Sequence, residues 1–209
     1  MSAVIENLKL DAQGLIPAVV QDVHTKEVLM VAYMNQETVQ MTLETGKATF
    51  WSRSRQQVWV KGETSGNYLN VKQVRVDCDA DCLMILAEPE GPACHTGNRS
   101  CFYRKVEGDA LVEDTQETGD ILMHLCAVTE DRKKNPQPGS YTNYLLEKGE
   151  DKILKKVGEE AAEVVIAGKN RSKEEISYEV ADLMYHLSVM LVDNGMSWAE
   201  IYEELEKRR

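Results

Sequence analysis

The hydrophobic pattern of the chain changes near residue 112. Before this point, short apolar runs rich in Val, Thr, Trp and Tyr lie between turns that contain glycine, a pattern that is typical of β-strands. One early segment, residues 35–44, predicts a helix instead. After this point, apolar residues recur with the 3.6-residue period of helices that bury one face.

Three helices are predicted in the second part. Their apolar positions are, in order, Ile121, Leu122, Leu125 and Val128; Ile153, Val157, Ala161, Val164 and Val165; and Ile176, Val180, Leu183, Leu187 and Leu191. A proline-containing loop at residues 135–139 ends the first helix, and Asn194 and Gly195 end the third. An acidic stretch at residues 113–119 separates the two parts. We therefore predict an α+β chain with a β-rich N-terminal domain at residues 1–112 and an all-α domain at residues 119–209.

Composition and charge narrow the class of protein. The net charge of −11 and the pI near 4.9 argue against a nucleic-acid partner, which would require a basic face. The first 15 residues show no secretory signal, and no stretch approaches the roughly 20 apolar residues of a membrane span. The sequence thus predicts a cytoplasmic protein without a membrane partner. For such a protein with five cysteines, metal binding or catalysis is favoured over a set of disulfides.

Six candidate metal ligands lie within 25 residues of the β-rich part. They are the cysteines Cys78, Cys94 and Cys101 and the aspartates Asp77, Asp79 and Asp81. Thiolates select zinc, whereas carboxylates select magnesium or calcium. Three thiolates leave one zinc position open for water, as in catalytic sites. The N-terminal domain is therefore predicted to bind metal.

Other interpretations of this segment stay open. A disulfide set would leave one of the three cysteines unpaired, and Cys82 could supply a fourth thiolate and close a structural zinc site instead of packing as a small apolar residue. The aspartates could form the solvent face of a strand, in which case Cys78 would point to the opposite side.

The predicted helices carry a second set of carboxylates. Glu160 and Glu163 are three residues apart, and Glu179 and Asp182 repeat this spacing on the next helix. An antiparallel pair of these helices would bring the four together, and such a cluster needs divalent cations. Solvent-exposed faces would also explain glutamates, but Asp182 lies in an apolar run in mid-helix, where Asp is unfavourable. Lysines 152, 155 and 156 lie one turn upstream and could bind a polyphosphate, which suggests hydrolysis of a phosphoanhydride.

With both parts considered, the chain resembles the bifunctional histidine-biosynthesis enzymes, in which phosphoribosyl-AMP cyclohydrolase is fused to phosphoribosyl-ATP pyrophosphohydrolase. The cyclohydrolase resemblance covers residues 14–22, 28–30, 32–35, 49–55, 59, 61–63 and 65–67 and the metal segment itself. The pyrophosphohydrolase resemblance covers residues 140–142, 152–163 and 181–187.

For the first domain, the resemblance implies a homodimer in which the subunits share the zinc ligands. Cys78, Cys94 and Cys101 would bind Zn²⁺, and Asp77, Asp79 and Asp81 would bind Mg²⁺. The expected reaction opens the adenine ring of phosphoribosyl-AMP between N1 and C6 with a zinc-activated water. His95 is the candidate for proton transfer, with a supporting hydrogen bond to a ligand as its alternative role. The candidates for substrate binding are Arg53, Arg55, Lys61, Ser65 and either Trp51 or Trp59, which could stack on the base.

The second domain resembles the all-helical MazG-like pyrophosphohydrolases. This resemblance implies that Glu160, Glu163, Glu179 and Asp182 bind Mg²⁺, with Glu159 as a further ligand or a catalytic base, and that Lys155 and Lys156 hold phosphates. Phosphoribosyl-ATP would be split into phosphoribosyl-AMP and pyrophosphate, and the product would feed the first domain. Two rival hypotheses are a general nucleotide pyrophosphohydrolase with a zinc domain for dimerisation, and a non-catalytic zinc module joined to a helical interaction domain.

Overall fold

The computed structural model describes residues 3–114 and 119–208. It divides into two compact units, Met1–Gly119 and Asp120–Arg209. The predicted acidic connector falls at this division, but residues 115–118 of it lie outside the described residues. The predicted α+β class is confirmed, since the first unit is built on a β-sheet and the second unit is helical.

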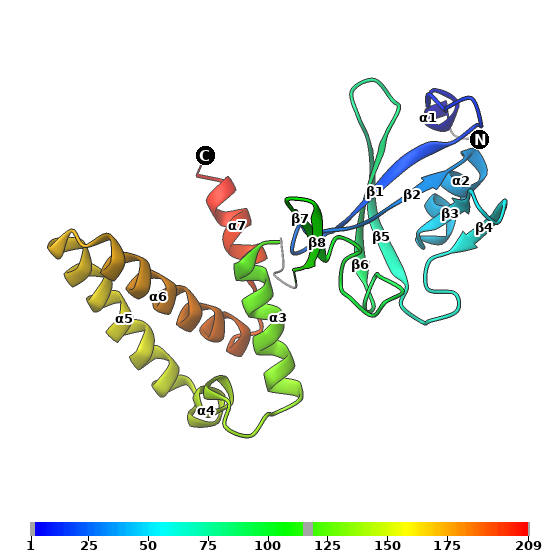
Figure 1. Ribbon diagram of the computed structural model, residues 1–209. Helices are drawn as coiled ribbons and strands as arrows, with labels where there is room; N and C mark the ends of the chain where they lie inside the picture. Colours follow the sequence, from blue (N-terminus) through cyan, green and yellow to red (C-terminus); the bar gives the residue numbers. More distant parts are fainter. Residues whose placement is uncertain (1–2, 115–118, 209) are drawn as a thin grey trace. The chain divides into compact units, whose positions relative to one another are not determined.

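A six-stranded sheet forms the first unit, with the strand order β4-β3-β2-β1-β6-β5 (Figure 1). Its strands are β1 (Ile16–Asp22), β2 (Val28–Met34), β3 (Thr49–Ser52), β4 (Gln57–Val60), β5 (Leu69–Val76) and β6 (Leu83–Pro89). All neighbours pair antiparallel except β1 and β6, which are parallel. A short helix, α1 (Ala3–Glu6), precedes the sheet, and a separate two-stranded ribbon, β7 (Arg104–Glu107) and β8 (Ala110–Glu113), follows it.

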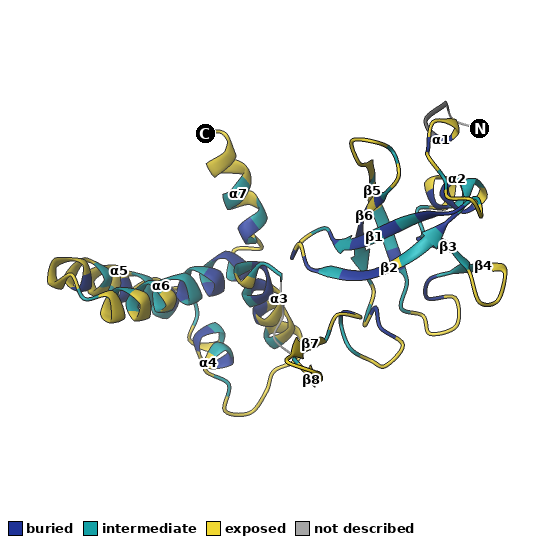
Figure 2. Cartoon of the chain, turned by 45° about the horizontal axis from the view of Figure 1, so that its top comes forward, coloured by how far each residue is buried: buried dark blue, intermediate teal, exposed yellow. Residues whose placement is uncertain are grey.

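The predicted early helix is α2 (Gln36–Thr45). Asn35 forms a capping box with Thr38, and Gly46 ends the helix at a φ of 69°, a conformation that glycine adopts without strain. The helix packs against β3 and buries Val39 in the core of the sheet. That core follows the alternation along β1, whose residues 16, 18 and 20 are fully buried (Figure 2).

Five helices form the second unit: α3 (Ile121–Lys134), α4 (Tyr141–Lys148), α5 (Glu150–Asn170), α6 (Lys173–Asp193) and α7 (Trp198–Glu206). The three predicted helices are α3, α5 and α6. Helices α5 and α6 have 21 residues each and form a long antiparallel hairpin, because only residues 171 and 172 join them (Figure 1). Helices α3 and α7 pack against the C-terminal part of α6. There the Trp198 indole donates a 2.8 Å hydrogen bond to Ser188.

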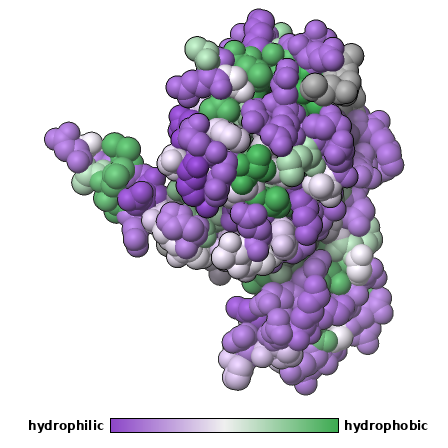
Figure 3. Space-filling view, turned by 90° about the vertical axis from the view of Figure 1, so that its right-hand side faces the viewer, coloured by the Kyte–Doolittle hydropathy of each residue, from purple (hydrophilic) through white to green (hydrophobic). Residues whose placement is uncertain are grey.

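Helices α4 and α7 were not predicted. Both are short, with eight and nine residues, so neither shows more than two turns of apolar periodicity. Their start signals were nevertheless present, since Ser140 caps α4 and Ser197 forms a capping box with Glu200 at α7. The face of the molecule in Figure 3 is mainly hydrophilic, with separate hydrophobic patches. None of the described helices combines the length and apolar character that crossing a bilayer requires.

Candidate active sites

Two of the candidate zinc ligands, Cys94 and Cys101, meet in the loop that follows β6. Their thiols hydrogen-bond each other. Burial raises the pKa of Cys94, but hydrogen bonds, above all the one from the Thr96 hydroxyl at 3.1 Å, outweigh burial and lower it. Burial and the neighbouring Cys94 sulfur raise the pKa of Cys101 to about 11, against an opposing effect of the Lys61 charge. In this pair the ionisation of one thiol opposes that of the other. A cation between the two sulfurs would stabilise both as thiolates, so the pair suits a metal site.

The third candidate, Cys78, lies elsewhere in the first unit. It sits on the turn between β5 and β6, whereas Cys94 follows the far end of β6, and Figure 1 shows the turn and the loop at opposite ends of this hairpin. Because β6 has seven residues and a strand rises about 3.3 Å per residue, roughly 20 Å separates its two ends. A single chain therefore brings together Cys94 and Cys101 but not Cys78.

The three aspartates occupy a turn, so the interpretation of this segment as the face of a strand is wrong. Ala80 has a φ of 63°, which breaks any extended conformation. Asp77 Oδ1 accepts hydrogen bonds from the amides of Asp81 (3.0 Å) and Cys82 (3.1 Å) and folds the turn back on itself. As a result Asp77, Asp79 and Asp81 each place a carboxylate oxygen within 4.8 Å of the others, all on exposed side chains.

Crowding of these carboxylates perturbs their ionisation. A hydrogen bond with Asp77 and the charge of Asp79 raise the pKa of Asp81. Burial acts to raise the pKa of Asp77 as well, but the amides that it accepts from lower it overall. The charge of Asp81 is therefore disfavoured by its neighbours, and the three clustered carboxylates are a suitable donor set for Mg²⁺.

A pocket of about 330 Å³ lies beside the Cys94–Cys101 loop. Its wall contains Cys94 together with the predicted site residues Arg55, Lys61, Ser65 and His95, and Trp59. Lys61 is only 9% exposed, and its positive charge acts on the nearby Cys101 thiol. The loop between β4 and β5, which also lines the pocket, keeps its shape because Gly62 has a φ of 93° and a side chain there would collide with the backbone of residues 67 and 68.

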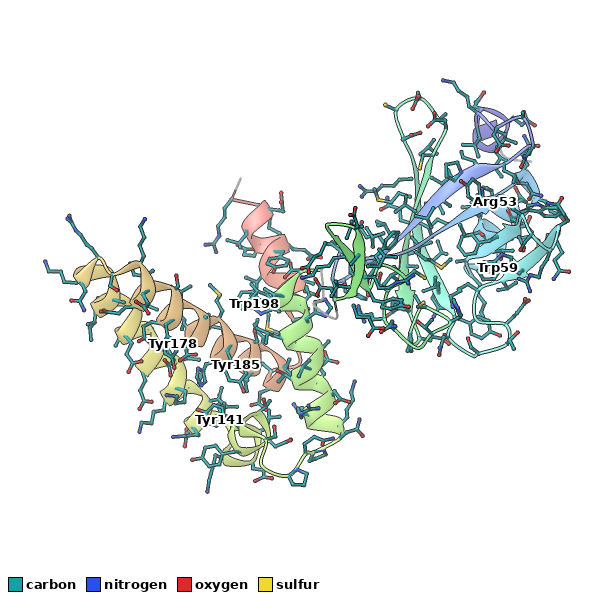
Figure 4. All side chains as sticks on the ribbon, viewed as in Figure 1. Arg53, Trp59, Tyr141, Tyr178, Tyr185 and Trp198 are labelled. Carbon is teal, nitrogen blue, oxygen red and sulfur yellow. The ribbon has the colours of Figure 1, made fainter. Side chains whose placement is uncertain are left out.

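Two predicted substrate-binding residues lie outside this pocket. The Arg53 guanidinium lies 3.7 Å from the centre of the Tyr33 ring, and Trp51 pairs with Val58 within the sheet. Trp59, by contrast, packs on Phe50 with the ring centroids 5.2 Å apart and also lines the pocket (Figure 4). A larger hollow of about 590 Å³ lies along α2. Its wall is formed by Leu10, Gly14, Asn35, Gln36, Glu37, Gln40 and Met41, which do not suit an anionic substrate.

In the helical unit, α5 and α6 bring carboxylates together between their facing sides. Oxygens of Glu160, Glu179 and Asp182 lie within 4.8 Å of one another, and Glu163 hydrogen-bonds Glu179. Burial, followed by the neighbouring carboxylates of Glu163, Asp182 and Glu160, raises the pKa of Glu179. Its Oε2 atom is buried and has no hydrogen-bond partner among the described residues. An orphaned carboxylate oxygen inside an acidic cluster is the feature that a divalent cation would satisfy.

The lysines differ in their relation to this cluster. Lys156 Nζ contacts the buried Glu160 at 2.6 Å and Glu159 at 3.2 Å, whereas Lys155 contacts only Glu159, at 3.2 Å. The two lysines lower the pKa of Glu159, whose side chain is 40% exposed on the flank of the cluster. Glu159 is therefore ionised and accessible, but it is not grouped with the three clustered carboxylates.

Sequence reasoning did not single out Tyr141, which extends the cluster toward solvent. Its hydroxyl lies 3.3 Å from His186 Nε2, and His186 Nδ1 lies 2.8 Å from the Asp182 carbonyl oxygen and 3.7 Å from Glu160 (Figure 4). The available signal was the four-residue spacing of Asp182 and His186, which places them on one helix face. Tyr141 belongs to the stretch 140–142 that resembles the pyrophosphohydrolases, but spacing could not link it to His186, because it comes from a different helix.

A chain whose two compact units each hold their own ligand cluster and cationic side chains has the organisation of a bifunctional enzyme. Comparisons with known proteins agree with this class. Residues 30–103 match the family model of phosphoribosyl-AMP cyclohydrolase, and residues 122–209 match that of phosphoribosyl-ATP pyrophosphohydrolase.

Full-length relatives share both parts. The histidine biosynthesis bifunctional protein HisIE of Caldanaerobacter subterraneus is 58% identical over 204 residues, which is 98% of this chain and 97% of the relative. Those of Thermoanaerobacter pseudethanolicus and Bacillus subtilis are 50% and 49% identical, over 98% and 97% of this chain and 100% and 95% of the relatives. The chain therefore belongs to the family of bifunctional histidine-biosynthesis enzymes and is a hydrolase with cyclohydrolase and pyrophosphohydrolase domains. Both rival hypotheses are wrong on this evidence.

Proposed function

We propose that the N-terminal unit works as a cytoplasmic homodimer in which Cys78 of one protomer and Cys94 and Cys101 of the other hold one Zn²⁺ ion. The observation that supports this proposal is the separation of Cys78 from the other two thiols by the length of β6. Three thiolates leave an open position, which suits catalysis better than a closed structural site. Cys82 is not needed as a fourth ligand, since burial and the charges of Asp77 and Asp81 raise its pKa and keep it a neutral thiol.

Zinc bound there would supply a Lewis acid that lowers the pKa of a water to about 7. Residues that line the 330 Å³ pocket bind the substrate and transfer the proton. Lys61 and Arg55 bind the phosphate of phosphoribosyl-AMP, and Trp59 offers an aromatic face to its base. His95, beside the ligand Cys94, moves a proton to the departing ring nitrogen as the bond between N1 and C6 breaks. The Asp77, Asp79 and Asp81 turn would hold Mg²⁺ and so reduce the negative charge near an anionic substrate.

We further propose that the helical unit is a MazG-like site in which Glu160, Glu163, Glu179 and Asp182 bind Mg²⁺. Magnesium there would neutralise the charge on the polyphosphate of phosphoribosyl-ATP. Lys156, already turned toward the cluster by its contact with Glu160, binds a phosphate oxygen. Glu159 acts as the base for water, because its lysine neighbours keep it ionised. The phosphoribosyl-AMP released here is the substrate of the N-terminal unit.

Complementation between two inactive variants tests the shared zinc site. Cys78→Ala and Cys101→Ala should each abolish ring opening when produced alone. In a dimer of one copy of each, one of the two sites regains all three thiolates. Co-production in equal amounts should therefore restore about one quarter of the wild-type ring-opening rate, since half of the dimers are mixed. Absence of any recovery in mixed dimers of confirmed composition would contradict the sharing of ligands between protomers.

A further inference from the structure

The loop that carries Cys94 and Cys101 is closed by its own backbone. The amide of Ala93 donates to the Arg99 carbonyl at 3.0 Å, and the amide of Cys94 donates to the Asn98 carbonyl at 3.1 Å. These bonds fix the course of the chain from Cys94 to Arg99, but they lie within the loop and do not attach it to the sheet. The spacing of the two thiols therefore depends on what holds the end of the loop next to Cys101.

Three consecutive residues anchor that end of the loop, two of them to the start of β2 and one to the turn before it. The Cys101 amide donates to the Leu29 carbonyl at 2.8 Å, and the Ser100 hydroxyl donates to the Val28 carbonyl at 2.7 Å. Arg99 supplies the third anchor, to the turn between β1 and β2. This is the one anchor of the three that uses charged groups, so it is the strongest candidate for holding the loop.

The Arg99 side chain is clamped by two buried carboxylates. Its Nη2 atom donates to Asp22 Oδ2 at 2.5 Å, and its Nε atom donates to Glu27 Oε2 at 2.7 Å. Asp22 is 2% and Glu27 is 5% exposed. The second oxygen of Asp22 accepts the amides of residues 24 and 25 and thereby shapes the β1–β2 turn that presents both carboxylates. Two buried anions this close are unfavourable without a cation, and the planar guanidinium fork can serve both at once.

We propose that Arg99 is a positioning residue for the Cys94 and Cys101 thiol pair. Held by Asp22 and Glu27, it fixes the loop on the sheet so that both sulfurs point to one metal position before the metal arrives. This inference rests on the proposed zinc site. Arg99 is not a substrate-binding group, since its Nε and Nη2 donors are occupied and it does not line the 330 Å³ pocket.

Zinc affinity of the purified full-length protein, measured by competition with a chromophoric chelator, tests this proposal. Arg99→Lys keeps the positive charge but loses the fork, and it should weaken zinc binding about 10- to 100-fold, the usual effect of removing a group that orients a ligand. Arg75→Lys, on an exposed side chain of β5, is the matched control and should bind zinc as the wild type does. Should Arg99→Lys fail to fold, Arg99→Gln with Asp22→Asn and Glu27→Gln removes all three charges together and should show the same weakening.

Two further readings separate positioning from a general loss of structure. Excess zinc should restore ring opening by Arg99→Lys, with the KM for phosphoribosyl-AMP unchanged, and pyrophosphate release by the helical unit should be unaffected throughout. Zinc affinity of the Arg99 variants within twofold of the wild type would overturn the inference and leave the proposed zinc site intact. A loss of activity that zinc does not restore, with a raised KM, would also overturn it. Wild-type protein that binds no zinc would instead refute the proposed function itself.

Discussion

Magnesium should stabilise the helical unit strongly, and one substitution should abolish this effect. The cluster contains Glu160, Glu179 and Asp182, with Glu163 nearby. Lys156 contacts it through Glu160, and one lysine is too few to balance four carboxylates in the metal-free protein. At a magnesium concentration 100 times its Kd, binding adds about 2.7 kcal/mol to the free energy of unfolding. For a unit of about 90 residues, whose unfolding entropy is about 0.19 kcal/mol per kelvin, this raises Tm by about 14 °C.

Glu179→Gln should raise the Tm of the metal-free protein and remove most of the stabilisation by magnesium. Because the pKa of Glu179 is raised by burial and by its acidic neighbours, its charged form is unfavourable in the folded cluster. The metal-free variant should therefore melt above the metal-free wild type, yet respond little to magnesium. Glu203→Gln, on an exposed side chain of α7, is the control and should retain the full magnesium response.

Circular dichroism at 222 nm during heating follows this unit, since all the long helices of the described residues belong to it. Scans of the wild type, Glu179→Gln and Glu203→Gln, each with magnesium and with a chelator, give the six Tm values that are needed. A Glu179→Gln variant that melts below the wild type without metal, or that gains as many degrees from magnesium as the wild type, would contradict a magnesium site at this cluster.

Three other predictions concern pH, packing and substrate binding. Without metal, Glu179 binds a proton more tightly in the folded state than in the unfolded state, so stability should fall as pH rises from about 4.3 through its raised pKa, as urea titrations across this range would show. Trp198→Phe removes the 2.8 Å bond to the buried Ser188 and should cost the helical unit about 1 to 2 kcal/mol in urea unfolding, without changing zinc content. Lys61→Met should raise the KM for phosphoribosyl-AMP about 10- to 100-fold, whereas Arg53→Met should leave it near the wild-type value, because Arg53 lies over Tyr33 and outside the pocket; steady-state kinetics with both variants gives the comparison.

Periodicity and ligand spacing predicted the secondary structure and the helical cluster well, for a local reason. Residues three or four apart on a helix share a face, so the positions of Glu160, Glu163, Glu179 and Asp182 followed directly from spacing and from one antiparallel pairing. In the β-rich part, spacing along the sequence predicted less about the positions of the candidate ligands. Cys78, Cys94 and Cys101 are close in sequence, but the course of β6 between them separates the first from the others, and spacing alone does not contain that information.

Roles that depend on long-range contacts could not be predicted. Arg53 and Lys61 look equivalent as candidate phosphate ligands, yet only Lys61 lines the pocket. Arg99 gave no signal at all, because its partners Asp22 and Glu27 lie more than 70 positions earlier in the chain. The Asp77–Asp81 turn was open between two conformations, and the positive φ of Ala80 excludes the extended one.

We expect each unit to hold its own hydrolytic site, one based on Cys94 and Cys101 and one on Glu160 and its neighbours. The most direct test incubates phosphoribosyl-ATP, magnesium and zinc with the wild type, Cys101→Ala and Glu160→Gln and separates all products by chromatography. Wild type should yield pyrophosphate and the ring-opened product, Cys101→Ala should stop at phosphoribosyl-AMP, and Glu160→Gln should leave phosphoribosyl-ATP uncleaved while still opening added phosphoribosyl-AMP. Loss of both activities in either stably folded variant would contradict two independent sites.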